Sequence, residues 1–280
     1  MNYHQLLQKS QKLYADYRSH HCKWLLSHLT GYSLQELYSN LDIESKVSEE
    51  DFYALINVNL QGKPLAYILG YQTFLERDFI VNSNVFIPRT ETQELVENVL
   101  YYVADYFQDV KQIKVLDVAT GSGAIAISLA LEEAKLFVVA SDISSEALKV
   151  AKANAMNLNC QNIKFVNSNL LASFINNDDK FDILVCNPPY IGIDEQIENT
   201  VKDYEPNLAL FATDNGLFFY KLIFKQVKTI MNNKYLLAFE FGYSQKATLE
   251  ILVKQYFATS EYEFIKDING KWRMLFIYNE

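Results

Sequence analysis

The sequence is poor in the residue types that build metal clusters and disulfide frameworks. Its three cysteines, Cys22, Cys160 and Cys186, are odd in number and far apart. They match no metal-ligand spacing, so we expect neither a disulfide framework nor a bound metal. Unpaired cysteines suit a reducing compartment, and we expect a cytoplasmic protein.

Positive charge is also scarce. Lysine and arginine total 25 against 34 acidic residues, which gives a net charge of -9 at pH 7. No global field therefore draws the chain to a phosphate backbone, and we expect no direct binding of nucleic acid. A basic protein partner or a small cationic cofactor suits this charge balance better.

Long apolar runs are missing as well. No stretch approaches the roughly 18 uncharged apolar residues of a membrane span, and the polar start, Met1 to Ser10, has no apolar run after it. We therefore expect no signal peptide and no membrane association. Half of the 280 residues are nevertheless hydrophobic, which is ordinary for folded domains with their own cores.

Histidine and glycine are sparse, and their positions are informative. The four histidines, His4, His20, His21 and His28, lie near the start of the chain. The rest of the chain has no imidazole for acid–base work, which disfavours most hydrolases. With only nine glycines, those present are expected to occupy special backbone positions.

The first 62 residues predict a small helical domain, because apolar residues recur at three- and four-residue spacing. The expected helices are Tyr3–Tyr17, His21–Leu29, Ser33–Ser39 and Glu49–Leu60. Ser33 with Glu36 predicts a capping box, while Gly31 and Gly62 predict helix ends.

Between Pro64 and Arg89 the pattern changes to short alternating runs, Gln72–Phe74 and Phe79–Val81. Such runs predict a hairpin-like connector. We therefore expect a helical substrate-binding domain over residues 1–70, the connector over residues 71–89, and one large domain over residues 90–280.

From Thr90 onward the pattern predicts an alternation of helices and strands. Thr90 with Gln93 predicts a capping box at the start of a helix that reaches Phe107. Later helices are expected at Ala124–Glu133, Ser145–Leu158, Leu217–Met231 and Ser244–Phe257. Strands are expected at Ile113–Val118, Leu136–Ser141, Ile163–Asn167, Phe181–Cys186, Tyr235–Phe241, Tyr262–Asp267 and Trp272–Tyr278.

This alternation predicts an α/β fold, a Rossmann-like, mostly parallel sheet with helices on both faces. The last two strands are joined by the short Asn269-Gly270 segment. A connection this short cannot cross over between parallel strands, so the C-terminal pair must be an antiparallel hairpin.

A glycine-containing turn lies between the strand Ile113–Val118 and the helix that follows. The loop residues are Ala119, Thr120, Gly121, Ser122 and Gly123. A turn of small residues at the carboxyl end of a parallel strand is where doubly wound folds bind nucleotide-type ligands.

Two aspartates accompany the loop. Asp142 ends the next strand, where an acidic side chain can accept hydrogen bonds from ribose hydroxyls. Asp117, at the tip of the first strand, can steady the loop or face the cationic end of a cofactor. Taken alone, Gly121, Gly123 and Ala126 also fit a nicotinamide-binding pattern, and a glycine turn needed only for packing remains an alternative.

The tetrapeptide Asn187-Pro188-Pro189-Tyr190 follows the strand Phe181–Cys186. An amide nitrogen is a poor nucleophile, so an enzyme must accept its hydrogens and aim its remaining electron density. The side-chain oxygen of Asn187 and the carbonyl of Pro188 can accept these hydrogens, and the prolines stiffen the turn. Tyr190 offers a flat face to a planar group. Two alternatives to this catalytic role are a strand that simply ends at a proline and a nucleophilic Cys186. The sequence around Cys186 predicts a buried strand residue, which disfavours the second alternative.

The chain resembles the HemK/PrmC family of protein-(glutamine-N5) methyltransferases nearly from end to end. The resemblance rests first on the glycine loop and on the segments Pro64–Gly70, Phe86–Thr92 and Asn187–Ile191. Further matches are Tyr204-Glu205-Pro206, Ala209-Leu210, Asp214–Leu217, Glu240-Phe241-Gly242, Asp267–Gly270 and Arg273.

The resemblance implies a class I methyltransferase domain with a seven-stranded sheet, S-adenosylmethionine as cofactor, and a helical domain that helps to hold the substrate. The substrate it implies is the glutamine of the Gly-Gly-Gln motif in class I peptide chain release factors. The cofactor would contact Asp117, the loop Ala119–Gly123, Asp142, Asn169, Leu170 and Asn187. The catalytic and glutamine-binding residues would be Asn187, Pro188, Pro189 and Tyr190, with Arg89 near the mouth of the site.

The sequence departs from the family pattern at four positions. Ala119 replaces a glycine, which is tolerable at negative φ and costly at positive φ. Asn169 replaces an aspartate and Leu170 an aromatic residue, so the adenine contacts are expected to differ. Gln93 replaces a glutamate but can still complete a capping box.

Other functions remain open at this point. A ribosomal-protein glutamine methyltransferase is the nearest alternative, and a nucleic-acid base N-methyltransferase uses the same tetrapeptide chemistry. Against the latter stand the acidic charge and the lack of a basic recognition segment. A nicotinamide oxidoreductase is opposed by the C-terminal hairpin. A cofactor-binding pseudoenzyme is suggested by the departures from the family pattern.

Overall fold

The computed structural model describes residues 1–14, 17–175 and 180–279. Residues 15–16 of the first expected helix, and residues 176–179 and 280 of the expected large domain, lie outside the described residues. The chain divides into two compact units. The first comprises Met1–Tyr71 and Glu198–Tyr204, and the second Gln72–Ile197 and Glu205–Glu280.

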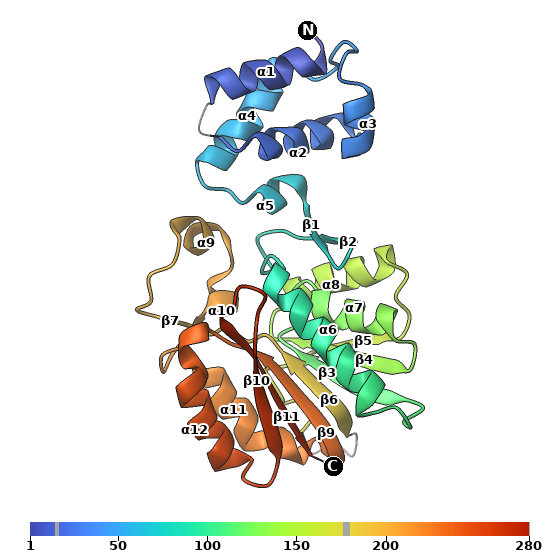
Figure 1. Cartoon of the computed structure of the whole chain (residues 1–280), viewed down its shortest axis with the longest axis vertical. Coiled ribbons are helices and arrows are strands. Elements are labelled where there is room, and N and C mark those ends of the chain that lie inside the picture. Colours follow the sequence, from blue (N-terminus) through green and yellow to red (C-terminus); the bar gives the residue numbers. More distant parts are fainter. Residues whose placement is uncertain (15–16, 176–179, 280) are drawn as a thin grey trace. The chain divides into compact units, whose positions relative to one another are not determined.

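The first unit is helical, with the small bundle of α1 to α4 drawn in blue in Figure 1. Its helices are α1 (Tyr3–Leu13), α2 (Ser19–Thr30), α3 (Leu34–Ser39), α4 (Glu49–Leu60), α5 (Leu65–Leu69) and α9 (Asn199–Tyr204). Tyr3, Leu25, Leu26, Phe52 and Ile56 are buried in its core. The expected capping box of Ser33 with Glu36 is confirmed.

Helix α5 was not predicted. The alternating runs expected between Pro64 and Arg89 were Gln72–Phe74 and Phe79–Val81, and no helix was expected before them, but Leu65–Leu69 forms a short helix. Gly70 ends this helix in the left-handed region, with φ +82°. A segment of five residues carries too little periodicity to be distinguished from a strand.

Helix α9 joins the helical unit although more than a hundred residues separate it from the rest of that unit. The hydroxyl of Tyr204 donates to the carbonyl oxygen of Gln61 at 3.3 Å. A β-carbon added at Gly62 would lie 3.3 Å from Thr200 and 3.5 Å from Tyr204. Gly62 therefore provides the space into which α9 packs.

The second unit is built on a seven-stranded sheet with the order β10-β11-β9-β6-β3-β4-β5. The strands are β3 (Ile113–Val118), β4 (Leu136–Asp142), β5 (Ile163–Asn167), β6 (Phe181–Cys186), β9 (Met231–Glu240), β10 (Glu261–Lys266) and β11 (Trp272–Asn279). Strands β3, β4, β5, β6 and β9 pair in parallel, while β11 is antiparallel to both β9 and β10. The expected antiparallel C-terminal pair is therefore confirmed.

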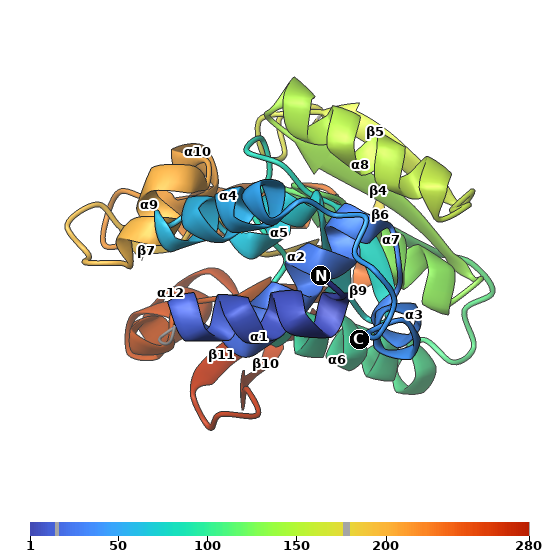
Figure 2. The same cartoon turned by 90° about the horizontal axis from the view of Figure 1, so that it is seen from above.

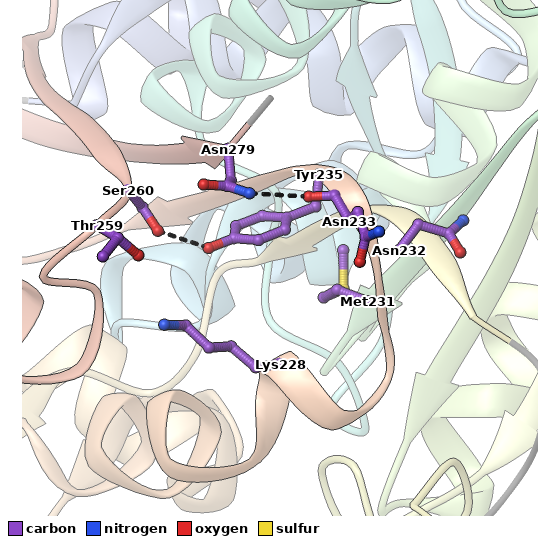
Figure 3. Close-up of a pocket in the computed structure, with 8 residues that line it drawn as sticks. All are labelled: Lys228, Met231, Asn232, Asn233, Tyr235, Thr259, Ser260 and Asn279. Carbon is purple, nitrogen blue, oxygen red and sulfur yellow. Dashed lines mark hydrogen bonds between the residues drawn. The ribbon is translucent and has the colours of Figure 1, made fainter.

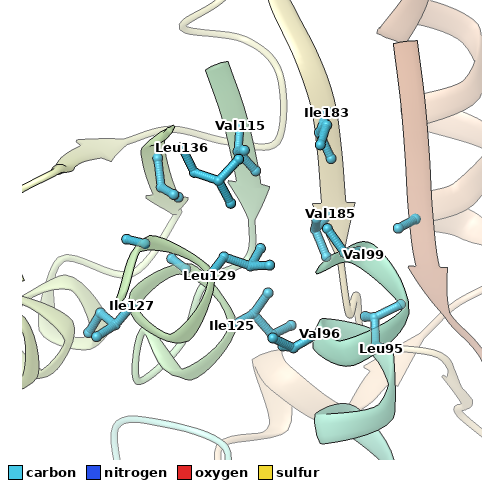
Figure 4. Close-up of a cluster of buried hydrophobic side chains, with 14 of the residues drawn as sticks. Leu95, Val96, Val99, Val115, Ile125, Ile127, Leu129, Leu136, Ile183 and Val185 are labelled. Carbon is cyan, nitrogen blue, oxygen red and sulfur yellow. The ribbon is translucent and has the colours of Figure 1, made fainter. Parts of the chain in front are cut away.

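Both faces of this sheet are covered by helices (Figures 1 and 2). Helices α6 (Thr90–Asp105), α7 (Ala124–Glu132) and α8 (Ser145–Asn157) cover one face, and α11 (Phe218–Gln226) and α12 (Lys246–Tyr256) cover the other. Along β6, Ile183 and Val185 pack toward α6 and α7, as Figure 4 shows, while Leu184 and Cys186 pack toward α11 and α12. This alternation buries both faces of each central strand.

Shorter elements complete the second unit. These are the hairpin strands β1 (Tyr71–Phe74) and β2 (Arg77–Ile80), the paired strands β7 (Ile191–Gly192) and β8 (Phe211–Ala212), helix α10 (Asn207–Leu210), and the 3-10 turns η1 (Val227–Thr229) and η2 (Tyr243–Gln245). The hairpin turns at Leu75 and Glu76, which both have positive φ. None of the helices in the described residues is long and apolar enough to cross a membrane.

Candidate active site

The carboxyl ends of four neighbouring strands place three predicted site residues and one further residue side by side. Val118 of β3 pairs with Ser141 of β4 and with Cys186 of β6, and Cys186 pairs with Phe239 of β9. The next residue along each strand continues this register. The resulting edge row consists of Asp142, Ala119, Asn187 and Glu240.

The glycine loop is held by its own hydrogen bonds. The backbone N–H of Thr120 donates to Ser141 at 2.9 Å, and the N–H of Gly123 donates to Thr120 at 2.8 Å. The carbonyl of Ser122 accepts from the side-chain amide of Asn154 on α8 at 2.8 Å. A β-carbon at Gly123, where φ is +83°, would lie 2.8 Å from Ile127. The left-handed backbone and this crowding both favour glycine where the loop enters α7.

Ala119 adopts the conformation that is costly for alanine. Its φ is +60°, in the left-handed region where a β-carbon is crowded by the following carbonyl. The family glycine that Ala119 replaces would adopt this conformation without strain. The substitution therefore stores backbone strain of about 1 to 2 kcal/mol at the first position of the loop.

Asp117 is completely buried beneath the loop. Its Oδ2 accepts a hydrogen bond from the hydroxyl of Thr120 at 2.6 Å, whereas Oδ1 has no hydrogen-bond partner within the described residues. Burial raises the pKa of Asp117 to about 7; the Thr120 hydroxyl and the backbone of Ala126 oppose this rise, and the nearby Asp142 adds to it. Asp117 is thus bonded to the loop through Thr120, while a contact with a cofactor stays a prediction.

Asp142 lies at the end of β4 with only 9% of its surface exposed. Oδ2 accepts from the N–H of Gly121 at 2.9 Å, and Oδ1 accepts from the N–H of Ser144 at 2.8 Å. Burial raises the pKa of Asp142, while these backbone donors lower it. Each carboxylate oxygen keeps a further lone pair with which it can accept a ribose hydroxyl.

Asn169 and Leu170 follow β5, the edge strand beside β4. The N–H of Ser168 donates to the carbonyl of Asp142 at 3.0 Å, so this turn begins next to the edge row. Asn169 is exposed, and Leu170 has φ +48°. Their expected contacts with adenine stay predictions.

Asn187 to Tyr190 form a turn that is fixed from several sides. Pro188 and Pro189 are buried, and the amide group of Asn187 donates to Thr92 Oγ1 at 3.3 Å. The hydroxyl of Tyr190 donates to Glu240 at 3.2 Å, and its carbonyl accepts from Gln245 at 2.8 Å. The neighbouring Cys186 is buried, which raises its pKa well above the ordinary value and disfavours it as a nucleophile.

Gly216 lies against the same turn. A β-carbon at this position would lie 2.0 Å from the carbonyl oxygen of Tyr190 and 2.3 Å from Gln245 Nε2. Gln245 also donates to Asn215 and accepts from the N–H of Gly242. These contacts tie the loops that follow β6, β8 and β9 into one support for Tyr190.

Arg89 forms an ion pair with the buried carboxylate of Glu205, and its guanidinium lies 4.6 Å from the ring of Phe86. Glu205 also accepts from the N–H of Ile87 at 3.2 Å. About a third of the Arg89 side chain is exposed. The ion pair fixes the entry into α6, while a contact of Arg89 with substrate stays a prediction.

The expected capping box of Thr90 with Gln93 is wrong. The N-cap residue of α6 is Arg89, and no side chain of the described residues caps the helix there. Thr90 already lies inside the helix as its first residue, so its side chain cannot act as the N-cap. Gln93 therefore has no capping role.

Sequence reasoning missed two buried residues next to Asn187. Thr92 donates from its hydroxyl to Glu240 Oε2 at 2.6 Å, and both side chains are nearly inaccessible. The only indications in the sequence were the segments Phe86–Thr92 and Glu240-Phe241-Gly242, both noted as family matches. Their roles depend on contacts between residues that are far apart in the chain.

A pocket at the opposite end of the sheet is not part of this site (Figure 3). It is lined by Lys228, Met231, Asn232, Asn233, Tyr235, Thr259, Ser260 and Asn279. Met231 begins β9 and Asn279 ends the antiparallel β11, so the pocket lies at the amino end of the central strands. The edge row lies at their carboxyl end.

The fold and the edge row define a class I S-adenosylmethionine-dependent methyltransferase. Residues 5–70 match the model of the PrmC N-terminal domain, and residues 99–204 match the Methyltransferase small domain. The release factor glutamine methyltransferase of Bacillus subtilis is 39% identical over 90% of this chain and 88% of its own length. That of Mycoplasma mycoides is 36% identical over 91% of this chain and 90% of its own. The chain belongs to the release factor glutamine methyltransferase family.

A solved structure agrees with the fold. The human methyltransferase 10 domain containing protein superposes with a TM-score of 0.52, at 18% identity, over 81% of this chain and 97% of that one. At this identity the likeness concerns the fold alone.

S-adenosylmethionine is the methyl donor of this enzyme, and the edge row fits it. A β-carbon at Gly121 would meet none of the described residues within 4 Å, so the loop is open at this position. Asp142, beside the loop, has lone pairs that can accept further hydrogen bonds, and one oxygen of the buried Asp117 has no hydrogen-bond partner among the residues that the structure describes. The loop Ala119–Gly123, Asp117 and Asp142 are the residues that would hold the donor.

Proposed function

We propose that this chain methylates the side-chain amide N5 of the glutamine in the Gly-Gly-Gln motif of class I peptide chain release factors. The observation that carries the proposal is the edge row, in which Asn187 stands directly beside the glycine loop. The family membership supports the same substrate. The reaction would act on translation termination in the cytoplasm.

Methyl transfer to an amide nitrogen requires precise positioning of the substrate amide rather than a strong base. The substrate amide nitrogen is weakly nucleophilic, and the donor, when bound, supplies a methyl group on a positive sulfonium. Asn187 Oδ1 and the carbonyl of Pro188 are suited to accept the two amide hydrogens and to orient the nitrogen. Tyr190, held by Glu240 and Gln245, offers its ring to the planar amide.

Pro188 and Pro189 keep this arrangement rigid. Both are buried, and neither has a backbone N–H that could compete for the acceptors. A rigid turn limits the loss of conformational entropy when the glutamine binds, which favours reaction of the aligned groups.

The helical unit is the part that we propose holds the release factor. It has its own core and includes α9, which is contributed by the loop between β7 and α10. A variant that lacks residues 1–70 should still bind the donor but should methylate an intact release factor much more slowly. Unchanged turnover on the intact factor would remove this role.

One assay compares the candidate substrates directly. Labelled S-adenosylmethionine is offered with a purified class I release factor, with the same factor carrying alanine for the motif glutamine, with ribosomal proteins and with DNA. We expect label only on the unaltered release factor. Label on ribosomal protein or on DNA instead would assign the enzyme to one of the alternatives, and no transfer despite donor binding would indicate a pseudoenzyme.

A further inference from the structure

The side chain of Asn187 is the first member of a chain of hydrogen bonds that ends on a buried charge. Its amide nitrogen lies 3.3 Å from Thr92 Oγ1, and Thr92 Oγ1 lies 2.6 Å from Glu240 Oε2. Asn187 follows β6, Glu240 ends β9, and Thr92 lies in the first turn of α6. Three elements therefore meet at one point of the edge row.

The direction of these hydrogen bonds follows from the donors available. An ionised carboxylate only accepts, and a hydroxyl has a single hydrogen. Thr92 gives this hydrogen to Glu240, so its oxygen can only accept from Asn187. Asn187 must therefore turn its NH2 group toward Thr92, and its Oδ1 must face the other way.

This orientation matters because the two ends of an asparagine amide have nearly the same shape but opposite hydrogen-bonding roles. With Oδ1 outward, Asn187 accepts a hydrogen from the substrate amide. With NH2 outward, it would point hydrogens at the hydrogens of the substrate. The shape of the site alone does not select between the two orientations.

We propose that Thr92 and Glu240 are positioning residues that hold the Asn187 amide with its oxygen toward the substrate glutamine. The inference rests on the proposed function, because it assigns the orientation that this reaction needs. Neither residue has to touch the substrate. Both act through Asn187, and Glu240 acts through Tyr190 as well, whose hydroxyl binds its other oxygen.

Two hydroxyls and one cationic side chain favour the ionised form of Glu240, on which the direction of these hydrogen bonds depends. Glu240 is 2% exposed, and burial raises its pKa above the ordinary value. The Thr92 and Tyr190 hydroxyls and the charge of Arg273 on β11 oppose this rise, while Glu91 on α6 adds to it. Burying a charged group is unfavourable, and an apolar side chain would cost less if packing were its only role.

The first test replaces Thr92 by valine, which keeps the shape and removes the hydroxyl. We expect Thr92→Val to lower kcat for methylation of a release factor by about tenfold or more, as for the loss of a hydrogen bond in a network that ends on a charge. KM for the release factor and the affinity for S-adenosylmethionine should stay the same. Thr92→Ser, which keeps the hydroxyl, should restore most of the rate.

A matched control is available on the same helix turn. Thr90 is exposed, and Thr90→Val makes the same chemical change without touching Asn187. It should leave kcat unchanged. If Thr92→Val does not bind the donor, Thr92→Ala takes its place with the same expectation, since it also removes the hydroxyl.

A double-mutant cycle separates positioning from mere packing. In an Asn187→Ala background there is no amide to orient, so Thr92→Val should cause no further loss of rate. The inference would be overturned if the rate losses of Asn187→Ala and Thr92→Val multiply in the double variant. It would also be overturned if Thr92→Ser is as slow as Thr92→Val, or if Thr92→Val keeps full activity. Failure of the wild-type enzyme to methylate any release factor would instead remove the proposed function.

Discussion

Gly216 provides the sharpest test of how the Asn187–Tyr190 turn is supported. In Gly216→Ala the new β-carbon would lie 2.0 Å from the Tyr190 carbonyl oxygen and 2.3 Å from Gln245 Nε2. Real contacts of this kind are much longer, so the backbone of Tyr190 must move. The substitution also places alanine at φ +82°.

The steric clash and the left-handed backbone both lower the stability of Gly216→Ala. Alanine in the left-handed region costs about 1 to 2 kcal/mol, and overpacking a tight site costs about 1 to 3 kcal/mol. Together they predict that the free energy of unfolding falls by roughly 2 to 5 kcal/mol. A displacement of Tyr190 near 1 Å would also slow methylation by about a hundredfold.

Gly270 is the matched control in the same unit. Its φ is +76°, but a β-carbon there would meet nothing within 4 Å. Gly270→Ala should therefore cost only about 1 to 2 kcal/mol and leave the methylation rate unchanged. Denaturant unfolding and initial rates on both variants measure the difference. Equal losses of stability and full activity in both would refute the role of Gly216.

Three further outcomes are expected. Ala119→Gly should stabilise the protein by up to about 1 kcal/mol, because relief of left-handed strain exceeds the added entropy of the unfolded chain. The control Ala134→Gly changes a residue without positive φ and should destabilise the protein. Thermal unfolding of both variants measures the difference. Asp142→Ala should weaken binding of S-adenosylmethionine by about 1 to 3 kcal/mol in calorimetry, and unchanged affinity would contradict the ribose role. The folded pKa of Asp117, about 7, exceeds its unfolded value, so its contribution to stability is lost as pH rises from about 4 to 7. The melting temperature of the wild type should fall across that pH range relative to that of Asp117→Asn. Melting temperatures that change with pH in the same way for both proteins would contradict the raised pKa.

Much of the fold could be predicted because the central strands β3, β4 and β6 are short, mostly apolar and bounded by turn residues. Strands β3, β5 and β6 begin and end at the predicted residues, and the antiparallel pair followed from the short Asn269-Gly270 connection. The positions of Asp142 and Asn187 at one edge followed in turn, since parallel strands share their carboxyl ends.

The contacts that complete the site could not be predicted in the same way. Thr92 and Glu240 are 148 residues apart, and they meet because the first turn of α6 lies against the end of β9. Local periodicity carries no information about such a crossing. The same holds for α9, whose packing against Gly62 depends on the path of a long loop.

The backbone conformation of Ala119 is a third feature that could not be predicted from the sequence. Its side chain favours negative φ, yet hydrogen bonds of the following residues hold it at +60°. Tertiary contacts override the local preference here, at an expected cost in strain.

The most direct measurement follows methyl transfer to the motif glutamine of an intact release factor by peptide mass spectrometry, for the wild type, Asn187→Ala and Asn187→Asp. We expect the wild type to modify that glutamine alone, and Asn187→Ala to do so roughly a hundredfold to a thousandfold more slowly while binding the donor normally. Asn187→Asp keeps an acceptor and should retain more activity than the alanine variant. Modification at the wild-type rate by Asn187→Ala would contradict the assigned role of the edge row.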